Sequence, residues 1–485
     1  MSLLSPDVWA GKIFVDGWVE GGSGERAVVE PATGETLGTV GVASVEDVQR
    51  AATRAAHAQR DWAARPHPER AAVLRRAGQL WEQHGEEIDQ WIVRESGSIP
   101  PKARLETHTA AAICNESAAL PSYPSGRVLP SAEPRWSFSR RKPVGVVSVI
   151  APFNFPLILS IRSVAPALAL GNAVLLKPDP RTAVCGGVAL VRIFQEAGLP
   201  DGLVQLLVGG AEVGEAVVSA PEVAVVSFTG STKAGRIVGR MAAANLKRVH
   251  LELGGNSALV VLPGADLAKA ASAAAFGSFM HQGQICMTTG RHVVHESLHD
   301  EFVARLAEKA SHLPVGNPAR EQVALGPVID HQQLGRIDDI VQRTVLAGAR
   351  LAAGGTSEGL FYRPTVLAHV STDMPAYAEE VFGPVAPVVP FESVEQAIEL
   401  ASGTEYGLSL GILGDVGTAM RVADAVPSGI VHINEQTVAD EPNVPFGGVG
   451  VSGNGSRFGG AEANLEAFTD VQWLTVRSEI APYPF

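Results

Sequence analysis

Short apolar runs alternate with helical stretches through the middle of the chain. The run Val144–Ile150 contains a single polar side chain, which is typical of a parallel strand covered on both faces. It is followed in turn by a helical stretch, a strand, a second helical stretch and two more strands, at residues 157–170, 173–177, 182–197, 203–208 and 223–228. This alternation predicts a doubly wound parallel sheet, an α/β arrangement that binds ligands at the carboxyl ends of its strands.

The segment before this series is mostly helical. Ser44 and Asp47 fit a capping box ahead of an alanine-rich helix over 48–62, and a second helical pattern covers 68–95. After residue 254 the α/β pattern restarts, with expected strands and helices at 257–262, from 266, and at 291–295, 299–313, 333–347 and 393–401. The fold class that we predict is therefore α/β, with two doubly wound parallel-sheet domains.

Residues 123–142 have a different pattern, because Pro and Ser interrupt an alternating run that contains Trp136 and Phe138. This pattern predicts a hairpin, and an exposed hairpin offers a free edge for pairing with another subunit. An ordinary surface loop is the alternative. The tail beyond Pro445 is rich in glycine and then becomes extended over 468–476.

Composition narrows the functional classes. The formal charge of −13 argues against nucleic acid and anionic membrane as main partners. No apolar run approaches the roughly 20 residues that a membrane span needs, and the N-terminus lacks the features of a signal peptide. Three scattered cysteines do not make a disulfide framework and fit a reducing cytoplasm. Because the histidines and cysteines do not cluster at zinc-ligand spacing, we predict no metal site.

Two residues are candidates for chemistry on the pattern of their neighbours. Cys286 stands between flexible and apolar residues, where a thiolate could attack a carbonyl, and Glu252 is a lone carboxylate in an apolar run. A small buried cysteine without a catalytic role is the alternative. Phe228–Gly235 closes a strand and opens a helix, which fits a pyrophosphate site or a plain capped turn.

Several separated motifs, in order along almost the whole chain, resemble those of the aldehyde dehydrogenase superfamily. They are Pro152–Pro156 (Pro-Phe-Asn-Phe-Pro), Leu176–Pro178, Phe228–Thr232, Leu251–Gly255, Gly283–Cys286, Glu380–Pro384, Pro445–Gly448 and Ser452–Gly455. By this resemblance Cys286 is the nucleophile, which forms a thiohemiacetal with an aldehyde. Asn154 matches the oxyanion donor that acts with the Cys286 N–H, and Glu252 matches the base that activates water to hydrolyse the thioester.

The resemblance also implies a nicotinamide cofactor, NAD or NADP. The residues expected to bind it are Lys177 at the adenosine ribose, Gly230, Ser231 and Gly235 at the pyrophosphate, Glu380 at the nicotinamide ribose, and Phe382 and Phe153 as aromatic walls. Pro180 stands where the family often carries a glutamate that disfavours a 2′-phosphate. NADP therefore becomes an option, and Arg181 could assist it.

The segments 154–166 and 440–460 resemble the benzaldehyde and vanillin dehydrogenase branch, which implies an aromatic aldehyde as substrate. The expected pocket residues are Phe155, Ile158, Arg162, Ile285, Met287 and Phe446. Arg162 could instead bind a carboxylate, which would favour a succinate-semialdehyde-like or other aliphatic substrate, or it could pair with a nearby acid. A CoA-acylating member, which Glu252 argues against, and a non-catalytic binding protein are the remaining alternatives.

The domain organisation follows from the same resemblance. Residues 1–120 and 144–254 are expected to form the NAD(P)-binding domain, and 255–445 the catalytic domain. The hairpin 121–143 and the tail 446–485 would form a small β oligomerisation element, giving a homodimer or a homotetramer.

Overall fold

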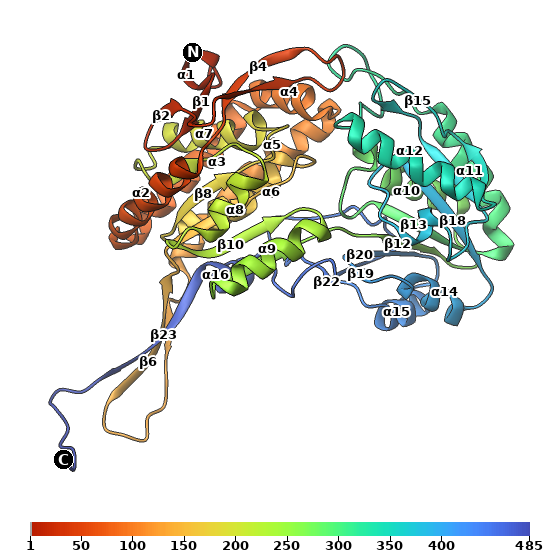
Figure 1. Ribbon diagram of the computed structural model, residues 1–485. Helices are drawn as coiled ribbons and strands as arrows, with labels where there is room; N and C mark the ends of the chain where they lie inside the picture. The colour runs from red at the N-terminus through yellow and green to blue at the C-terminus, as the bar shows by residue number, and fades with distance from the viewer. Residues whose placement is uncertain (1) are drawn as a thin grey trace.

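The computed structural model describes residues 2–485. Figure 1 shows two lobes side by side, each built around one sheet, and an arm that projects from the first lobe. The α/β class predicted from the sequence is confirmed, because helices cover two largely parallel sheets.

The first lobe contains a seven-stranded sheet in the order β11-β10-β7-β8-β9-β1-β2. Its strands are β1 (Lys12–Phe14), β2 (Trp18–Glu20), β7 (Val146–Ile150), β8 (Ala173–Lys177), β9 (Val204–Leu206), β10 (Val223–Thr229) and β11 (Arg248–Glu252). Neighbouring strands from β7 to β11 pair in parallel, while β1 and β2 form an antiparallel edge. All residues of β7 and β8 are buried, as expected for apolar runs covered on both faces.

The helices of this lobe lie on both faces of the sheet. They are α2 (Val45–Ala64), α6 (Pro156–Ala169), α7 (Ala189–Glu196), α8 (Ala211–Ser219) and α9 (Thr232–Ala244). α3 (His67–Gln83), α4 (Gly85–Ser96) and α5 (Pro100–Ser117) pack beside them, and α1 (Pro6–Trp9), β3 (Glu25–Val29) and β4 (Thr36–Gly41) lie near the N-terminus. The capping box of Ser44 and Asp47 is confirmed. The second helical pattern is confirmed as two consecutive helices, α3 and α4, separated at His84.

The second lobe contains a seven-stranded sheet in the order β14-β17-β18-β13-β12-β20-β21. Its strands are β12 (Ser257–Val261), β13 (Thr289–His295), β14 (Arg350–Ala353), β17 (Thr365–Ala368), β18 (Val385–Phe391), β20 (Ser409–Leu413) and β21 (Ile430–Ile433). Its helices are α10 (Leu267–Phe279), α11 (Glu296–His312), α12 (His331–Leu346), α13 (Pro375–Ala378), α14 (Val394–Ser402) and α15 (Val416–Ala425). Two short pairs, β15 (Ser357–Glu358) with β16 (Phe361–Tyr362) and β19 (Tyr406–Gly407) with β22 (Val449–Gly450), lie outside this sheet.

The arm is a three-stranded sheet of β5 (Gly126–Val128), β6 (Trp136–Pro143) and β23 (Thr469–Val476), with β23 following α16 (Ala461–Phe468). The hairpin predicted from the sequence is confirmed, and the C-terminal strand pairs with β6 along its whole length. Trp136 and Trp473 are exposed on this arm, at 66% and 64%. The arm therefore presents apolar side chains to solvent, at the lower left of Figure 1.

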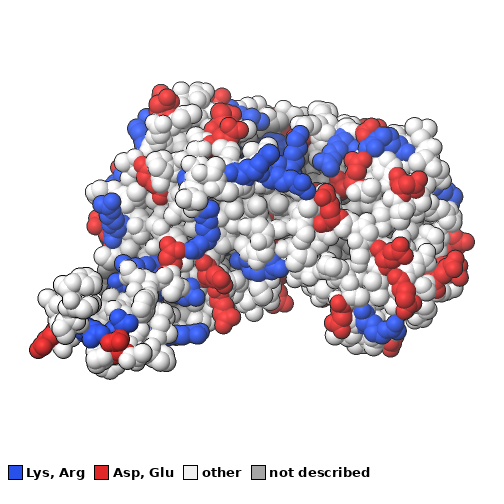
Figure 2. All heavy atoms as spheres, turned by 60° about the horizontal axis from the view of Figure 1, so that its bottom comes forward, with Lys and Arg blue, Asp and Glu red and all other residues white. Residues whose placement is uncertain are grey.

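On the face drawn in Figure 2, acidic and basic side chains are interspersed and neither sign covers the face alone. Within residues 2–485, no helix is both long enough and apolar enough to span a bilayer.

Candidate active site

The candidate site lies where the carboxyl edge of the first sheet meets the amino edge of the second. β11 ends at Glu252, and only Leu253–Asn256 separate it from the start of β12. Cys286 precedes β13 by two residues. Strand pairing also places the ends of neighbouring strands in one row, since Thr229 pairs with Glu252 and Ile150 pairs with Lys177. The fold thus brings together groups that lie more than a hundred residues apart.

The turn before Cys286 has an unusual backbone that tertiary contacts hold in place. His281, Gln282 and Gly283 have φ values of 47°, 56° and 65°, in the left-handed region that non-glycine residues rarely adopt. The Gln282 side chain donates hydrogen bonds to the carbonyls of Gly97 at 2.9 Å and Pro327 at 2.7 Å. A side chain at position 283 would collide with the carbonyl of Gly383, so only glycine fits there.

The Cys286 thiol is half-buried and free of any disulfide. Burial, followed by the negative charges of Glu380 and Glu252, raises the pKa of this thiol to about 12. In the free protein at neutral pH the sulfur is therefore protonated. A base must accept this proton when the sulfur attacks an electrophile.

Asn154 lies four residues after the end of β7, and its side chain is buried. Its Nδ2 donates a hydrogen bond of 2.8 Å to the carbonyl of Gln284, which fixes the amide beside the cysteine turn. Both Asn154 and Cys286 line one cavity. Within residues 2–485 the backbone N–H of Cys286 makes no hydrogen bond, so two N–H donors are available near the sulfur. This is the arrangement that an oxyanion hole requires.

Glu252 is a buried carboxylate, and neither of its oxygens has a hydrogen-bond partner within residues 2–485. Burial raises the pKa of Glu252 well above its usual range, and the positive charges of Arg162 and Arg457 oppose this rise. Gly447 packs so closely that a Cβ there would lie 2.7 Å from Glu252 Oε1. The carboxyl group is thus held in an apolar place with a raised pKa, as a general base at neutral pH requires.

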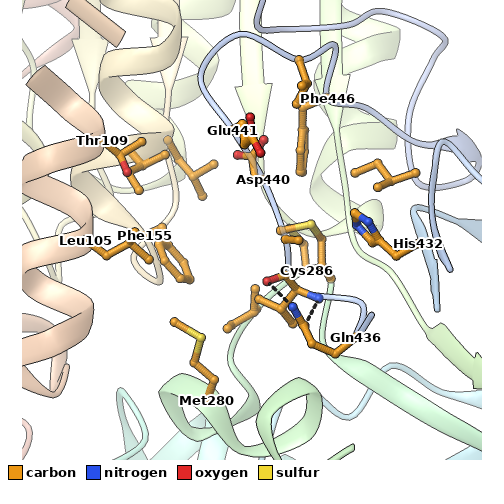
Figure 3. Close-up of a pocket in the computed structure, with 18 of the residues that line it drawn as sticks. Leu105, Thr109, Phe155, Met280, Cys286, His432, Gln436, Asp440, Glu441 and Phe446 are labelled. Atoms are coloured by element: carbon orange, nitrogen blue, oxygen red, sulfur yellow. Dashed lines mark hydrogen bonds between the residues drawn. The ribbon is translucent and has the colours of Figure 1, made fainter. Parts of the chain in front are cut away.

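A cavity of about 590 Å³ opens over Cys286, within the size range of small-molecule sites. All six pocket residues expected from the sequence line it. Figure 3 shows Cys286 at its centre, with Phe155, Leu105 and Thr109 on one side and Phe446 and His432 on the other. Further lining residues that the sequence did not reveal include Met280, Phe276, Gln436, Asp440 and Glu441. Cys286 packs against an apolar cluster that includes Ile285, Met287 and Phe446, and such surroundings suit a flat ring.

Arg162 lines the cavity and pairs with an acid, which is the second of the two alternatives that the sequence left open. Its Nη2 lies 2.8 Å from Asp440 Oδ2, and its guanidinium lies 4.4 Å from the centre of the Phe446 ring. Asp440 and Glu441 also give this part of the cavity an acidic character. A substrate carboxylate would therefore have to displace Asp440 and approach Glu441, which disfavours an anionic substrate.

The residues expected to bind a cofactor lie around the same edge of the first sheet. Lys177 ends β8, and Ser231 caps the thirteen-residue helix α9, whose first N–H groups follow the carboxyl end of β10. The Gly235 position is packed against Leu253, where a side chain would collide. β10 lies beside β7 although β8 and β9 come between them in sequence, so this row is a topological switch point, the usual ligand position in such sheets.

Aromatic and acidic groups extend this row toward the cysteine. The rings of Phe153 and Phe382 lie 6.0 Å apart in an edge-to-face arrangement. Glu380 Oε1 accepts a hydrogen bond of 2.9 Å from the Gly255 N–H, and burial raises the pKa of Glu380 to about 7. An ammonium and a helix N-terminus can bind the phosphates and ribose of a dinucleotide, a carboxylate can accept from ribose hydroxyls, and an aromatic pair can pack on a ring, so the residues fit such a cofactor.

The hypothesis that Arg181 assists a 2′-phosphate does not fit the structure. Arg181 is bound to Asp179 at 2.7 Å and to Asp330 at 2.6 Å, and it stacks 4.2 Å from the centre of the Phe153 ring. Asp330 caps α12, so Arg181 joins the two lobes instead. The charge of Glu212 also acts on Lys177, which puts a carboxylate near the expected ribose position.

One group of possible metal ligands exists within residues 2–485. It consists of His299, Asp300 and His369. β13, which follows Cys286, runs from Thr289 to His295 and leads into the α11 helix that carries His299 and Asp300. This group therefore lies at the opposite edge of the second sheet from Cys286, and the candidate site has no metal ligand set of its own.

The chain is similar to known proteins over nearly its whole length. The model of the Aldehyde dehydrogenase family matches residues 18–474. A vanillin dehydrogenase of an Amycolatopsis species is 63% identical, with 100% of each chain covered. A benzaldehyde dehydrogenase (NAD(+)) of Pseudomonas putida is 48% identical over 99% of this chain and 98% of its own. The crystal structure of a salicylaldehyde dehydrogenase from Pseudomonas putida G7 complexed with salicylaldehyde is 35% identical, with a TM-score of 0.94 over 98% and 99% of the two chains.

Proposed function

We infer that this chain, which belongs to the aldehyde dehydrogenase family, oxidises an aromatic aldehyde to the carboxylic acid with NAD or NADP. The observation that carries this inference is the apolar cavity of about 590 Å³ in which Cys286 and Asn154 meet. The relatives named above for vanillin, benzaldehyde and salicylaldehyde support a benzene ring as the part of the substrate that fills it. The pairing of Arg162 with Asp440 supports it over a succinate-semialdehyde-like substrate.

We propose that Cys286 attacks the aldehyde carbon and that its thiol proton passes to solvent water, which leaves Glu252 ionised for the hydrolytic step. The oxygen of the resulting thiohemiacetal becomes negative, and the Asn154 amide and the Cys286 N–H stabilise it. When bound, the nicotinamide cofactor accepts the hydride that leaves the same carbon. The thioester then remains on Cys286. Glu252 removes a proton from water, which attacks the thioester carbon and releases the carboxylic acid.

The cofactor site that we propose comprises the residues placed at the carboxyl edge of the first sheet. Lys177 would donate to the adenosine ribose, the N-terminus of α9 at Gly230 and Ser231 would bind the pyrophosphate with Gly235 as a close-packing position, and Glu380 would hold the second ribose. Phe153 and Phe382 would flank the nicotinamide. The charge of Glu212 near Lys177 supports NAD over NADP, because a carboxylate there repels a 2′-phosphate.

The domain roles follow from this assignment. We propose that residues 1–120 and 144–254 bind the dinucleotide and that 255–445 supply the nucleophile. The arm formed by residues 121–143 with the tail 446–485 would pair subunits, supported by its exposed Trp136 and Trp473. A homodimer or homotetramer is the expected assembly. The three free cysteines are in keeping with a reducing cytoplasm.

A single set of rate measurements tests the function. The formation of reduced nicotinamide is followed by absorbance with benzaldehyde, vanillin and succinate semialdehyde, each with NAD and with NADP. Cys286→Ala is the test variant, and Cys185→Ala, which removes a buried thiol elsewhere, is its matched control. We expect turnover of the aromatic aldehydes with NAD, retained in the control and abolished in Cys286→Ala. A preference for succinate semialdehyde would contradict the aromatic pocket.

A further inference from the structure

A buried ion pair on α5 lies directly behind the segment that carries Asn154. Lys102 and Glu106 are one helical turn apart, their side chains contact each other, and they are 1% and 0% exposed. Lys102 Nζ also donates a hydrogen bond of 2.7 Å to the backbone carbonyl of Asn154. The same ammonium lies 4.2 Å from the centre of the Phe155 ring. One side chain thus contacts both the oxyanion donor and the pocket wall that follows it.

Glu106 holds the other end of this segment. Its Oε2 accepts hydrogen bonds from the backbone N–H groups of Leu157 at 3.0 Å and Ile158 at 3.2 Å. These are the first N–H groups of α6 that need partners, since Pro156 has none to donate and Phe155 offers no side-chain cap. A carboxylate at this position is favoured by the helix dipole. The pair therefore grips the segment from Asn154 to Ile158 at both ends.

α5 also contributes directly to the cavity. Leu105 and Thr109, which are one turn apart on this helix, line the aldehyde pocket, as Figure 3 shows, while Lys102 and Glu106 lie on the buried side. A buried ion pair is often no more stabilising than apolar residues of similar size, so stability alone gives a weak reason for its presence. Contact with Asn154 gives a functional reason.

We propose that Lys102, held by Glu106, is a positioning residue that fixes the backbone of Asn154, so that the Asn154 amide meets the oxyanion formed on the substrate. Lys102 touches neither substrate nor Cys286 and acts through Asn154. This proposal rests on the proposed function, in which Asn154 is the oxyanion donor. A purely structural role for the pair, as a cap of α6, is the alternative.

A double-mutant cycle separates the two roles. Loss of an oxyanion donor costs about 10²- to 10³-fold in kcat, so misplacing the donor by Lys102→Met should cost about 10- to 100-fold with little change in KM. In an Asn154→Ala background the same Lys102→Met change should cost less than about twofold, because the group that Lys102 positions is gone. Thr107→Val, which removes a buried hydroxyl on the same helix without contact to Asn154, is the matched control.

A second readout checks the integrity of the cysteine turn. Alkylation of Cys286 by iodoacetamide forms no oxyanion, so its rate should be unchanged in Lys102→Met. Glu106→Gln keeps an oxygen for the α6 N–H groups but no longer anchors Lys102, and it should show the same pattern in the cycle. It also carries the test if Lys102→Met fails to fold.

The outcomes distinguish this proposal from the function on which it rests. The positioning role alone would be overturned if Lys102→Met lowered kcat by the same factor in the wild-type and Asn154→Ala backgrounds. It would also be overturned if a folded Lys102→Met variant kept the wild-type kcat. An Asn154→Ala variant with unchanged kcat would remove the oxyanion role itself and the positioning role with it.

Discussion

Removal of either partner of the Arg162–Asp440 pair should shift the pH dependence of turnover, and the two shifts should have opposite signs. Burial raises the pKa of Glu252, the charge of Arg162 lowers it, and the charge of Asp440 raises it. Arg162→Met therefore raises this pKa further, and Asp440→Asn lowers it. Because ionised Glu252 is the proposed base, the acid limb of kcat against pH should move to higher pH in the first variant and to lower pH in the second.

The size of the shift follows from the contacts. The shift for Arg162→Met should be larger than the shift for Asp440→Asn, because the charge of Arg162 acts on the Glu252 carboxyl more strongly than the charge of Asp440 does. The pair is 6% and 21% exposed, so water reaches the carboxylate that remains. The stability cost of Arg162→Met should therefore stay below the roughly 3–5 kcal/mol of breaking a fully buried pair.

The measurement is kcat for benzaldehyde from about pH 5 to about pH 10, with saturating cofactor, for the wild type and both variants. Thermal unfolding confirms that each variant is folded at the ends of this range. Arg336→Met, which removes a cation that contacts the Glu380 carbonyl, is a control in which the pKa of Glu252 should stay unchanged. Two shifts of the same sign, or no shift in either variant, would refute the electrostatic reasoning.

Three further predictions concern single contacts. Burial raises the pKa of Glu95 from 4.5 to about 7, so between these pH values the native state keeps a proton that the unfolded state releases. The free energy of unfolding of the wild type in urea should therefore fall by about 3 kcal/mol, relative to Glu95→Gln, as the pH rises from 4.5 to about 7. Parallel pH profiles of the wild type and Glu95→Gln would contradict this prediction. In Gly447→Ala the new Cβ would lie 2.7 Å from Glu252 Oε1 and would displace the carboxyl group. The kcat should therefore fall at least about tenfold while the cofactor Kd stays unchanged. An unchanged kcat would show that the carboxyl group has room to move. Arg181→Met should lower the Tm but leave the ratio of NADP to NAD affinity within about twofold, and a selective loss of NADP binding by calorimetry would restore the 2′-phosphate hypothesis.

Features determined by neighbours in sequence were predictable. β7 and β8 are mostly apolar because both faces are covered, and the break between strand and helix at Phe228–Gly235 follows from local chemistry. The resemblance also gave six expected pocket residues, and the structure places all six around one cavity. The helical pattern at 68–95 is confirmed, but apolar spacing did not reveal that it divides at His84 into α3 and α4.

Features that depend on distant partners were not predictable. The helix expected at 182–197 begins with a π-helical turn at Val184–Val188, where the Glu95 carboxylate accepts the N–H groups of Val184 and Cys185. Arg162 gave two alternatives in the sequence because its partner Asp440 lies 278 positions away. Lys102 and Glu106 have visible helical spacing, but only the fold shows that they meet Asn154.

The central claim is that Cys286 carries the acyl group and Glu252 releases it. The most direct measurement is the intact mass of Glu252→Gln after mixing with benzaldehyde and NAD, followed by peptide mapping. We expect one benzoyl group bound to Cys286 and one equivalent of reduced nicotinamide per subunit, because hydride transfer proceeds in this variant while thioester hydrolysis stalls. Continued turnover without an acylated Cys286, or acylation of another residue, would contradict the account.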